Sequence, residues 1–165
     1  MTTDPDGHER WMRLAIEEAQ AAAAKGEVPV GAVIVCDGRM LGRDQNRVLR
    51  QRDPTAHAEM LAIRAATQTL GYERLTGATL YATLEPCAMC AGAIVLARIG
   101  CLVYGADDAK TGACGSLRNI VQDARLNHRV KVVRGVLQPE CAEMLRVFFR
   151  EVRHKSEETE RCESG

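Results

Sequence analysis

Two short segments of the sequence hold side chains that together could bind a metal and move a proton. His57 and Glu59 are separated by one residue, and Cys87 and Cys90 follow Pro86 in a Pro-Cys-x-x-Cys segment. One imidazole and two thiolates make three zinc ligands, the number found in catalytic sites that keep a fourth position open. We therefore predict one catalytic zinc ion per subunit, held by His57, Cys87 and Cys90, with Glu59 as the group that takes and returns the proton of a zinc-activated water.

The same side chains have simpler interpretations when each is taken alone. Cys87 and Cys90 could form a reducible pair like that of thioredoxin-like proteins, and Glu59 could only stabilise the positive end of a helix. A structural zinc site needs a fourth ligand at short spacing, but the other cysteines and histidines are isolated in the sequence. A metalloprotease needs two histidines four residues apart on one helix. The catalytic zinc site is favoured because it accounts for all four residues together.

A metal can bring His57 and Glu59 together only if a helix begins at the histidine, because residues two apart lie about 200° apart around an ideal helix. We predict such a helix over 57–69, with the first or last residue of Asp53-Pro54-Thr55 as its N-cap. A second helix over 86–98 would begin at the proline, which places both cysteines in its first turn. The backbone N–H groups of that turn favour thiolates, the form that binds a metal.

The rest of the chain alternates between short apolar runs and amphipathic segments. The pattern predicts strands over 31–36, 39–46, 78–83, 101–105 and 130–136, and further helices over 9–25 and from Pro139 to about Arg153. An Asp-Gly pair at 37–38 predicts the turn of a hairpin. We therefore expect an α/β protein with a mixed five-stranded sheet covered by helices on both faces, and a site just beyond the strand ends.

The composition is that of a single globular domain. The chain has 165 residues, 22 basic and 22 acidic side chains, and seven cysteines. We expect one domain over 1–155 and a disordered acidic tail over 156–165. The cysteine count fits a reducing compartment, and the sequence shows no signal peptide and no membrane span, so we expect a cytoplasmic protein. Three basic groups, within 43–52, 125–134 and 146–155, modestly favour a nucleic-acid partner.

Longer segments around these residues are similar to a known family. The combination of His-x-Glu with Pro-Cys-x-x-Cys resembles the signature of the cytidine deaminase-like superfamily. Segments 27–33, 53–59, 80–93 and 110–117 resemble, more specifically, the bacterial tRNA-specific adenosine deaminases, and the similarity covers about residues 8 to 153. The resemblance implies a three-layer α/β/α fold of the cytidine deaminase-like type.

The resemblance also implies an activity, partners and several contacts. It implies a homodimer that converts adenosine to inosine at wobble position 34, in the anticodon stem-loop of tRNA. The target base must be splayed out of its loop to reach the zinc. By resemblance, six side chains would hold the base or the RNA around it: Asn46, Asp108, Lys110, Asn127, Phe149 and Arg153. Of these, Asn46 corresponds to the asparagine that holds the base in the family.

Two other functions stay open at this point. A deaminase of free bases or nucleosides, such as guanine or cytosine, would share all of the zinc chemistry. A zinc-stabilised partner subunit without activity would have no need of Glu59. The segments that flank the ligands, together with the basic groups, favour RNA as the substrate.

Overall fold

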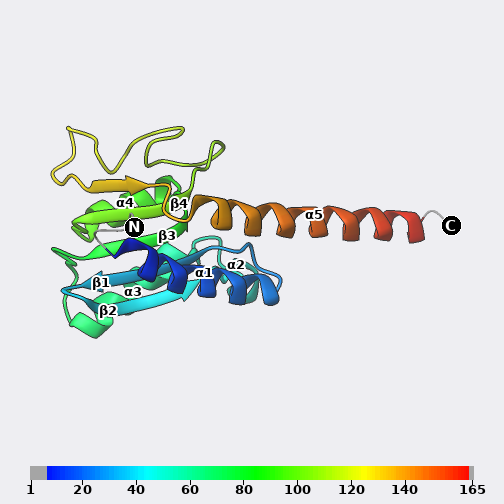
Figure 1. Cartoon of the computed structure of the whole chain (residues 1–165), viewed down its shortest axis with the longest axis horizontal. Coiled ribbons are helices and arrows are strands. Elements are labelled where there is room, and N and C mark those ends of the chain that lie inside the picture. Colours follow the sequence, from blue (N-terminus) through cyan, green and yellow to red (C-terminus); the bar gives the residue numbers. More distant parts are fainter. Residues whose placement is uncertain (1–6, 164–165) are drawn as a thin grey trace.

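The computed structural model of the chain describes residues 7–163, and its centre is one mixed sheet of five strands (Figure 1). The strands are β1 (Gly31–Cys36), β2 (Arg39–Gln45), β3 (Thr79–Leu84), β4 (Cys101–Ala106) and β5 (Lys131–Arg134). They lie in the order β2-β1-β3-β4-β5, with β1 antiparallel to both of its neighbours and β3, β4 and β5 parallel to one another. The predicted mixed sheet is confirmed.

Helices cover both faces of this sheet. They are α1 (His8–Ala24), α2 (Val48–Gln51), α3 (Ala58–Leu70), α4 (Ala88–Leu96) and α5 (Gln138–Glu163). Successive side chains of a strand point to opposite faces. In β1, Ala32 and Ile34 therefore join the core formed with α3 and α4, whereas Val33 and Val35 join the core formed with α1 and the start of α5. The protein has the three predicted layers, with one apolar core on each side of the sheet.

Small side chains let two helices approach the sheet closely. The buried faces of α1 and α3 are rich in alanine, and the strands they pack against carry Gly31 and Gly42. A Cβ atom on Gly42 would lie 2.7 Å from the carbonyl oxygen of Ala62, and one on Gly31 would overlap the carbonyl group of Ala15. A larger residue at Gly42 would push away α3, the helix that begins beside His57.

The hairpin between β1 and β2 has the turn that its Asp-Gly pair predicts. Asp37 and Gly38 have positive φ angles of 49° and 71°, which is the backbone of a type I′ turn. The register shifts by one residue at an irregularity between Ile34 and Val35, so that Gly31 pairs with Gln45. The end of β2, where Asn46 follows, therefore lies beside the beginning of β1.

The last helix is longer than the sequence pattern indicated. We predicted that it ends near Arg153 and that 156–165 is disordered, but α5 continues to Glu163 and extends beyond the rest of the molecule (Figure 1). Residues 154–163 include neither glycine nor proline, and the hydroxyl groups of Ser156 and Thr159 donate to carbonyl oxygens one turn earlier. Residues 164–165 lie outside the described part. None of the described helices, α5 included, is both long and apolar enough to cross a membrane.

Candidate active site

The predicted metal ligands lie at the starts of two helices. His57 is the N-cap residue of α3 and Cys87 is the N-cap residue of α4, and both have extended backbone angles. Cys90 follows in the first turn of α4 and is fully buried. We predicted that Pro86 begins this second helix, but the helix begins at Ala88, because the backbone of Cys87 is still extended. The N-termini of α3 and α4 therefore meet at the cluster that the side chains of His57, Cys87 and Cys90 form.

The three side chains have the spacing of a zinc site. The Sγ atoms of Cys87 and Cys90 each lie 3.6 Å from Nδ1 of His57. Zn–S bonds of about 2.3 Å and Zn–N bonds of about 2.0–2.1 Å at the tetrahedral angle separate sulfur from nitrogen by about 3.5–3.6 Å. All three ligand atoms lie within 4.8 Å of one another. The geometry and the donor set therefore fit a tetrahedral metal ion with one position left for a further ligand.

The ionisation of Cys87 favours cation binding, whereas His57 and Cys90 would have to give up protons to a metal. Hydrogen bonds from Cys90 and then from His57 lower the pKa of Cys87 to about 4. The hydrogen bond to Cys87 raises the pKa of His57. The pKa of Cys90 is raised, because its thiol donates to Cys87 and because it is buried. The cluster thus holds protons between its sulfur and nitrogen atoms, and a metal cation would replace them.

Glu59 is a buried carboxyl group next to this cluster. It is the second residue of α3 and only 4% exposed. Burial raises its pKa, because the charged form loses its hydration. A carboxyl group with a raised pKa can both accept and donate a proton near neutral pH, which is the property of a general acid and base.

A cavity of about 540 Å³ connects the cluster to the surface. His57, Glu59 and Cys87 line it, whereas Cys90 lies behind them in the protein. The cavity also brings in Asn46 after β2, and its remaining wall is mainly apolar. Its size is in the range of pockets that bind small organic molecules, and a nucleoside falls within that range.

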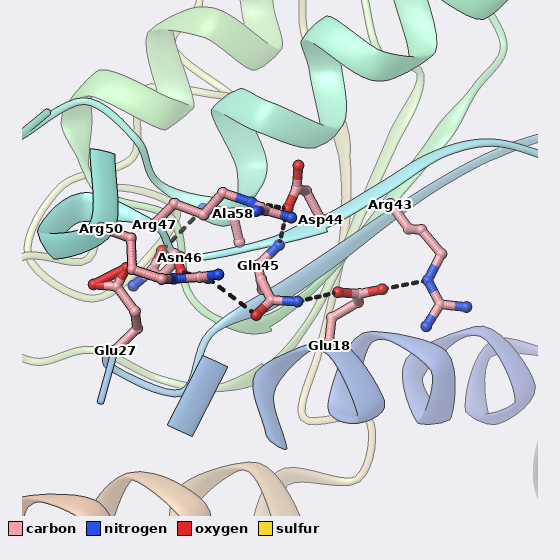
Figure 2. Close-up of polar contacts among 9 residues, drawn as sticks. All are labelled: Glu18, Glu27, Arg43, Asp44, Gln45, Asn46, Arg47, Arg50 and Ala58. Atoms are coloured by element: carbon pink, nitrogen blue, oxygen red, sulfur yellow. Dashed lines mark hydrogen bonds and ion pairs between the residues drawn. The ribbon is translucent and has the colours of Figure 1, made fainter. Parts of the chain in front are cut away.

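Asn46 connects the cavity wall to the start of α3. Its side-chain oxygen Oδ1 accepts the N–H of Ala58 at 2.9 Å (Figure 2). Asp53 and Thr55, the caps that we predicted, instead hydrogen-bond to each other within their own turn. The amide nitrogen Nδ2 of Asn46 has no partner among the described residues, so it remains a donor for a ligand in the cavity.

We expect Asn46→Asp and Asn46→Ala to separate these two roles. Aspartate keeps an oxygen that caps α3 but loses the N–H donor, so zinc content should stay at the wild-type level while KM rises about tenfold or more. Alanine also loses the cap, which should lower the free energy of unfolding by about 1 kcal/mol. Steady-state kinetics, zinc analysis and thermal unfolding would measure the three effects. A wild-type KM for Asn46→Asp would contradict the donor role.

The segment that carries Asn46 is held by ion pairs and hydrogen bonds (Figure 2). Arg50 donates to the side chain of Gln45 and to the carbonyl oxygen of Asn46, and its Nε lies 3.5 Å from the buried carboxylate of Glu27. Gln45 in turn donates to Glu18 on α1 at 2.8 Å. These contacts fix the end of β2 relative to both α1 and the loop before β1.

The first basic group of the sequence is therefore largely neutralised within the fold. Arg43 pairs with Glu17 and Glu18, and Arg47 pairs with Asp44. With Arg50 already bound to Glu27, three of the arginines in 43–52 have acidic partners. The sequence could not indicate this, because most of these acids lie far from the arginines along the chain.

The six residues assigned by resemblance divide into two sets. Asn46, Asp108 and Phe149 line the cavity, whereas Lys110, Asn127 and Arg153 do not. Asp108 and Thr111 form a turn in which the aspartate accepts the backbone N–H groups of Lys110 and Thr111 and the hydroxyl group of Thr111. Asn127 accepts two hydrogen bonds from Arg98. Lys110 is exposed on the loop that carries Asp108, and Arg153 is exposed on α5.

The two adjacent phenylalanines of α5 both reach the cavity. Adjacent residues of a helix point about 100° apart, yet neither ring is fully buried: Phe148 is half-buried and Phe149 is 44% exposed. Their rings meet edge to face, with centroids 5.4 Å apart. They form an aromatic rim where α5 passes the mouth of the cavity.

Sequence reasoning missed two buried glutamates that also line the cavity, Glu27 and Glu85. Glu85 directly follows β3 and precedes Pro86, whereas Glu27 lies in the loop between α1 and β1. An acidic residue at the end of a buried strand needs hydrogen-bond partners, and that requirement is the signal that could have singled out Glu85.

Comparisons with known proteins agree with this geometry. The family model for MafB19-like deaminases matches residues 6–153. A tRNA-specific adenosine deaminase of Bacillus subtilis (strain 168) is 52% identical over 147 residues, which cover 89% of this chain and 91% of the relative. The chain belongs to the tRNA-specific adenosine deaminases. The His-x-Glu and Pro-Cys-x-x-Cys segments that form the cluster both lie within the residues that the family model matches.

Solved structures show the same relationship. A protein studied for A-to-I editing by tRNA:A34 deaminases at the wobble position superposes with a TM-score of 0.80 at 48% identity, covering 82% of this chain and 99% of that one. Guanine deaminase from Bacillus subtilis superposes with a TM-score of 0.59 at 44% identity, covering 61% and 64%. The chain therefore has the cytidine deaminase-like fold, and its likeness to the tRNA:A34 deaminase extends over more of its length than its likeness to guanine deaminase.

Proposed function

We propose that this protein is a zinc-dependent deaminase that converts adenosine to inosine at wobble position 34 of tRNA. The observation that carries the proposal is the meeting of three zinc-type ligands with Glu59 at the base of one cavity. The identity of 52% to a tRNA-specific adenosine deaminase over nearly the whole domain supports the substrate. The tRNA substrate also supports a cytoplasmic location, and the odd number of seven cysteines fits a reducing compartment.

The residues of the cavity divide the reaction between them. A zinc ion held by His57, Cys87 and Cys90 would supply a water whose pKa is lowered to about 7. Glu59 takes a proton from the attacking water and delivers it to N1 of adenine, while the oxygen bonds to C6. Glu59 then moves the remaining proton of that oxygen to the amine at C6, which leaves as ammonia. Asn46 donates from Nδ2 to the base and holds C6 toward the ligands.

The second candidate function is deamination of a free base such as guanine. It is favoured by the fold shared with guanine deaminase, because the zinc chemistry of the two activities is the same. The mouth of the cavity argues for a larger substrate, because its rim includes exposed parts of α5. A splayed nucleotide must remain joined to its loop, and an open rim allows the chain to pass out.

The deciding experiment measures inosine in an anticodon stem-loop transcript that carries A34. The matched control transcript has guanosine at position 34 and adenosine at position 35, so that only the position of the adenosine differs. Conversion of the first transcript alone, by zinc-loaded protein, is the expected result. Release of ammonia from guanine or cytosine, with neither transcript converted, would overturn the proposal in favour of the second candidate.

We also propose that the protein is a homodimer that uses one face of α4. Met89, Gly92, Ala93 and Leu96 recur at helical spacing, and α4 carries no charged side chain. Leu96 is 80% exposed, which is unusual for a large apolar residue on an uncharged helix. A second copy of the chain would cover this face, and the face lies on the helix that carries two of the metal ligands.

The dimer predicts that Leu96→Glu is monomeric. A charge at the centre of an apolar interface is left without a partner, so association should weaken by at least about tenfold. Sedimentation equilibrium of the purified proteins would measure this. Met40→Glu places the same charge on another exposed apolar side chain, on the edge strand β2, and should remain dimeric. An unchanged dimer in Leu96→Glu would contradict the use of this face.

A further inference from the structure

Glu85 is a buried carboxylate whose partners all come from one loop. It follows β3 directly and is only 2% exposed. Among the described residues, no lysine, arginine or histidine forms an ion pair with it. A buried carboxylate without a cationic partner is costly unless hydrogen bonds satisfy both of its oxygens, so its surroundings must supply donors.

The loop over 107–118 supplies four of them. Oε1 of Glu85 accepts the backbone N–H of Asp108 at 3.2 Å and the hydroxyl group of Ser116. Oε2 accepts the backbone N–H groups of Cys114 and Ser116 at 3.1 and 3.0 Å. Hydrogen bonds to an ionised acceptor are about twice as strong as those between neutral groups. One side chain therefore holds both ends of this loop.

The same loop forms part of the cavity and touches the metal-ligand segment. Asp108 and Thr111 line the cavity, and Ala113 donates its N–H to the carbonyl oxygen of Pro86 at 2.9 Å, just before Cys87. Gly112 lies against the carboxylate of Glu85 so closely that a Cβ atom would overlap it. The loop therefore packs directly against this carboxylate, and no side chain larger than that of glycine fits at position 112.

We propose that Glu85 is a positioning residue for substrate binding: it holds the Asp108–Thr111 wall of the cavity in register with the ligand Cys87. The proposal rests on the proposed function, because it assigns the loop to the RNA substrate. Glu85 does not reach the reacting atoms in this assignment, and its hydrogen bonds go to the loop and not to His57, Cys87 or Cys90. Its loss should therefore weaken binding of the RNA more than the chemical step.

Glu85→Gln tests this with almost no change of shape. The remaining oxygen of glutamine can serve the N–H groups of Cys114 and Ser116, but its NH2 group then faces the N–H of Asp108, donor against donor. We expect KM for the A34 stem-loop to rise about tenfold or more, with kcat within about threefold of wild type and zinc content unchanged. Glu140→Gln, an exposed carboxylate that binds Arg13 on the surface, is the matched control and should keep the wild-type KM.

Two further measurements keep the test independent of folding and of activity. Ser116→Ala removes one of the four donors and should raise KM by a smaller factor than Glu85→Gln does. The double variant that carries both substitutions should raise KM by less than the product of the two single effects. Hydrogen exchange should accelerate at the amides of Asp108, Cys114 and Ser116 in Glu85→Gln, and not in β1.

These measurements distinguish failure of the proposed function from failure of the positioning role of Glu85. Wild-type protein that does not convert A34 would overturn the proposed function alone, since the exchange measurement still reports on the loop. An unchanged KM and unchanged loop exchange in Glu85→Gln, with active wild-type protein, would overturn the role of Glu85 alone. A fall in kcat that follows a loss of zinc, with KM unchanged, would also overturn it.

Discussion

Glu59→Gln should reduce kcat on the A34 stem-loop by about a thousandfold or more while zinc content stays at one ion per chain. The side chain is buried beside the ligand cluster, and burial raises its pKa, so it is suited to accept and return a proton. Glutamine fills the same space but cannot accept a proton, and general acid–base catalysis contributes about 10²–10⁴ to a rate. Single-turnover measurement of inosine formation gives the chemical step directly.

The comparison variant for this prediction is Glu27→Gln. Glu27 is also a buried glutamate that lines the cavity, but its Oε1 accepts the N–H of Leu49 and holds the backbone. Glu27→Gln should lower kcat by less than about tenfold, because no proton transfer is assigned to Glu27. Similar losses in the two variants, or substantial turnover by Glu59→Gln, would contradict the assigned role of Glu59.

Cys90→Ser should abolish both zinc binding and activity. The Sγ atom is fully buried and lies 3.6 Å from Nδ1 of His57. A serine hydroxyl group there replaces a strong zinc ligand with a weak one, and no water molecule from solvent can reach this position to replace the lost ligand. Folding should be weakened as well, because metal binding to preformed ligands stabilises the folded state. Zinc analysis, thermal unfolding and the inosine assay would measure the three effects.

A matched cysteine is available for this second prediction. Cys141 is equally buried, but it lies on α5 in the core on the other face of the sheet, where burial raises the pKa of its thiol to about 12. Cys141→Ser should retain zinc and activity. Removal of zinc from wild-type protein with a chelator should likewise abolish turnover, and added zinc should restore it. Full activity of the chelated protein would contradict a catalytic metal.

Local sequence patterns predicted most of the architecture. The apolar run 31–36, the Asp-Gly turn and the alternation of helices with strands were sufficient for the five strands and the three layers, because these features depend on neighbours in the sequence. The short helix α2 was not predicted, since four residues show no periodicity. The extension of α5 was also missed, because acidic composition indicates solubility as readily as disorder.

Features that depend on distant residues were outside the reach of such patterns. The cap of α3 comes from Asn46, twelve positions before Ala58, and not from the adjacent Asp53-Pro54-Thr55 segment. Arg43 and Arg50 are bound to acids from α1 and from the loop before β1, so a count of charges overstated the basic surface. Glu85 was missed for the same reason, since its partners lie more than twenty residues away.

The double use of Asn46 restricts how the selectivity of this enzyme can evolve. Its oxygen serves the protein and its nitrogen is left for the ligand, so the two halves of one amide are under separate selection. A replacement that loses the oxygen disturbs the helix that begins beside His57, whatever it does for the base. Residues that retain an acceptor oxygen, such as aspartate, serine or threonine, are therefore the single-step routes by which a descendant could change its preferred base and still assemble its metal centre.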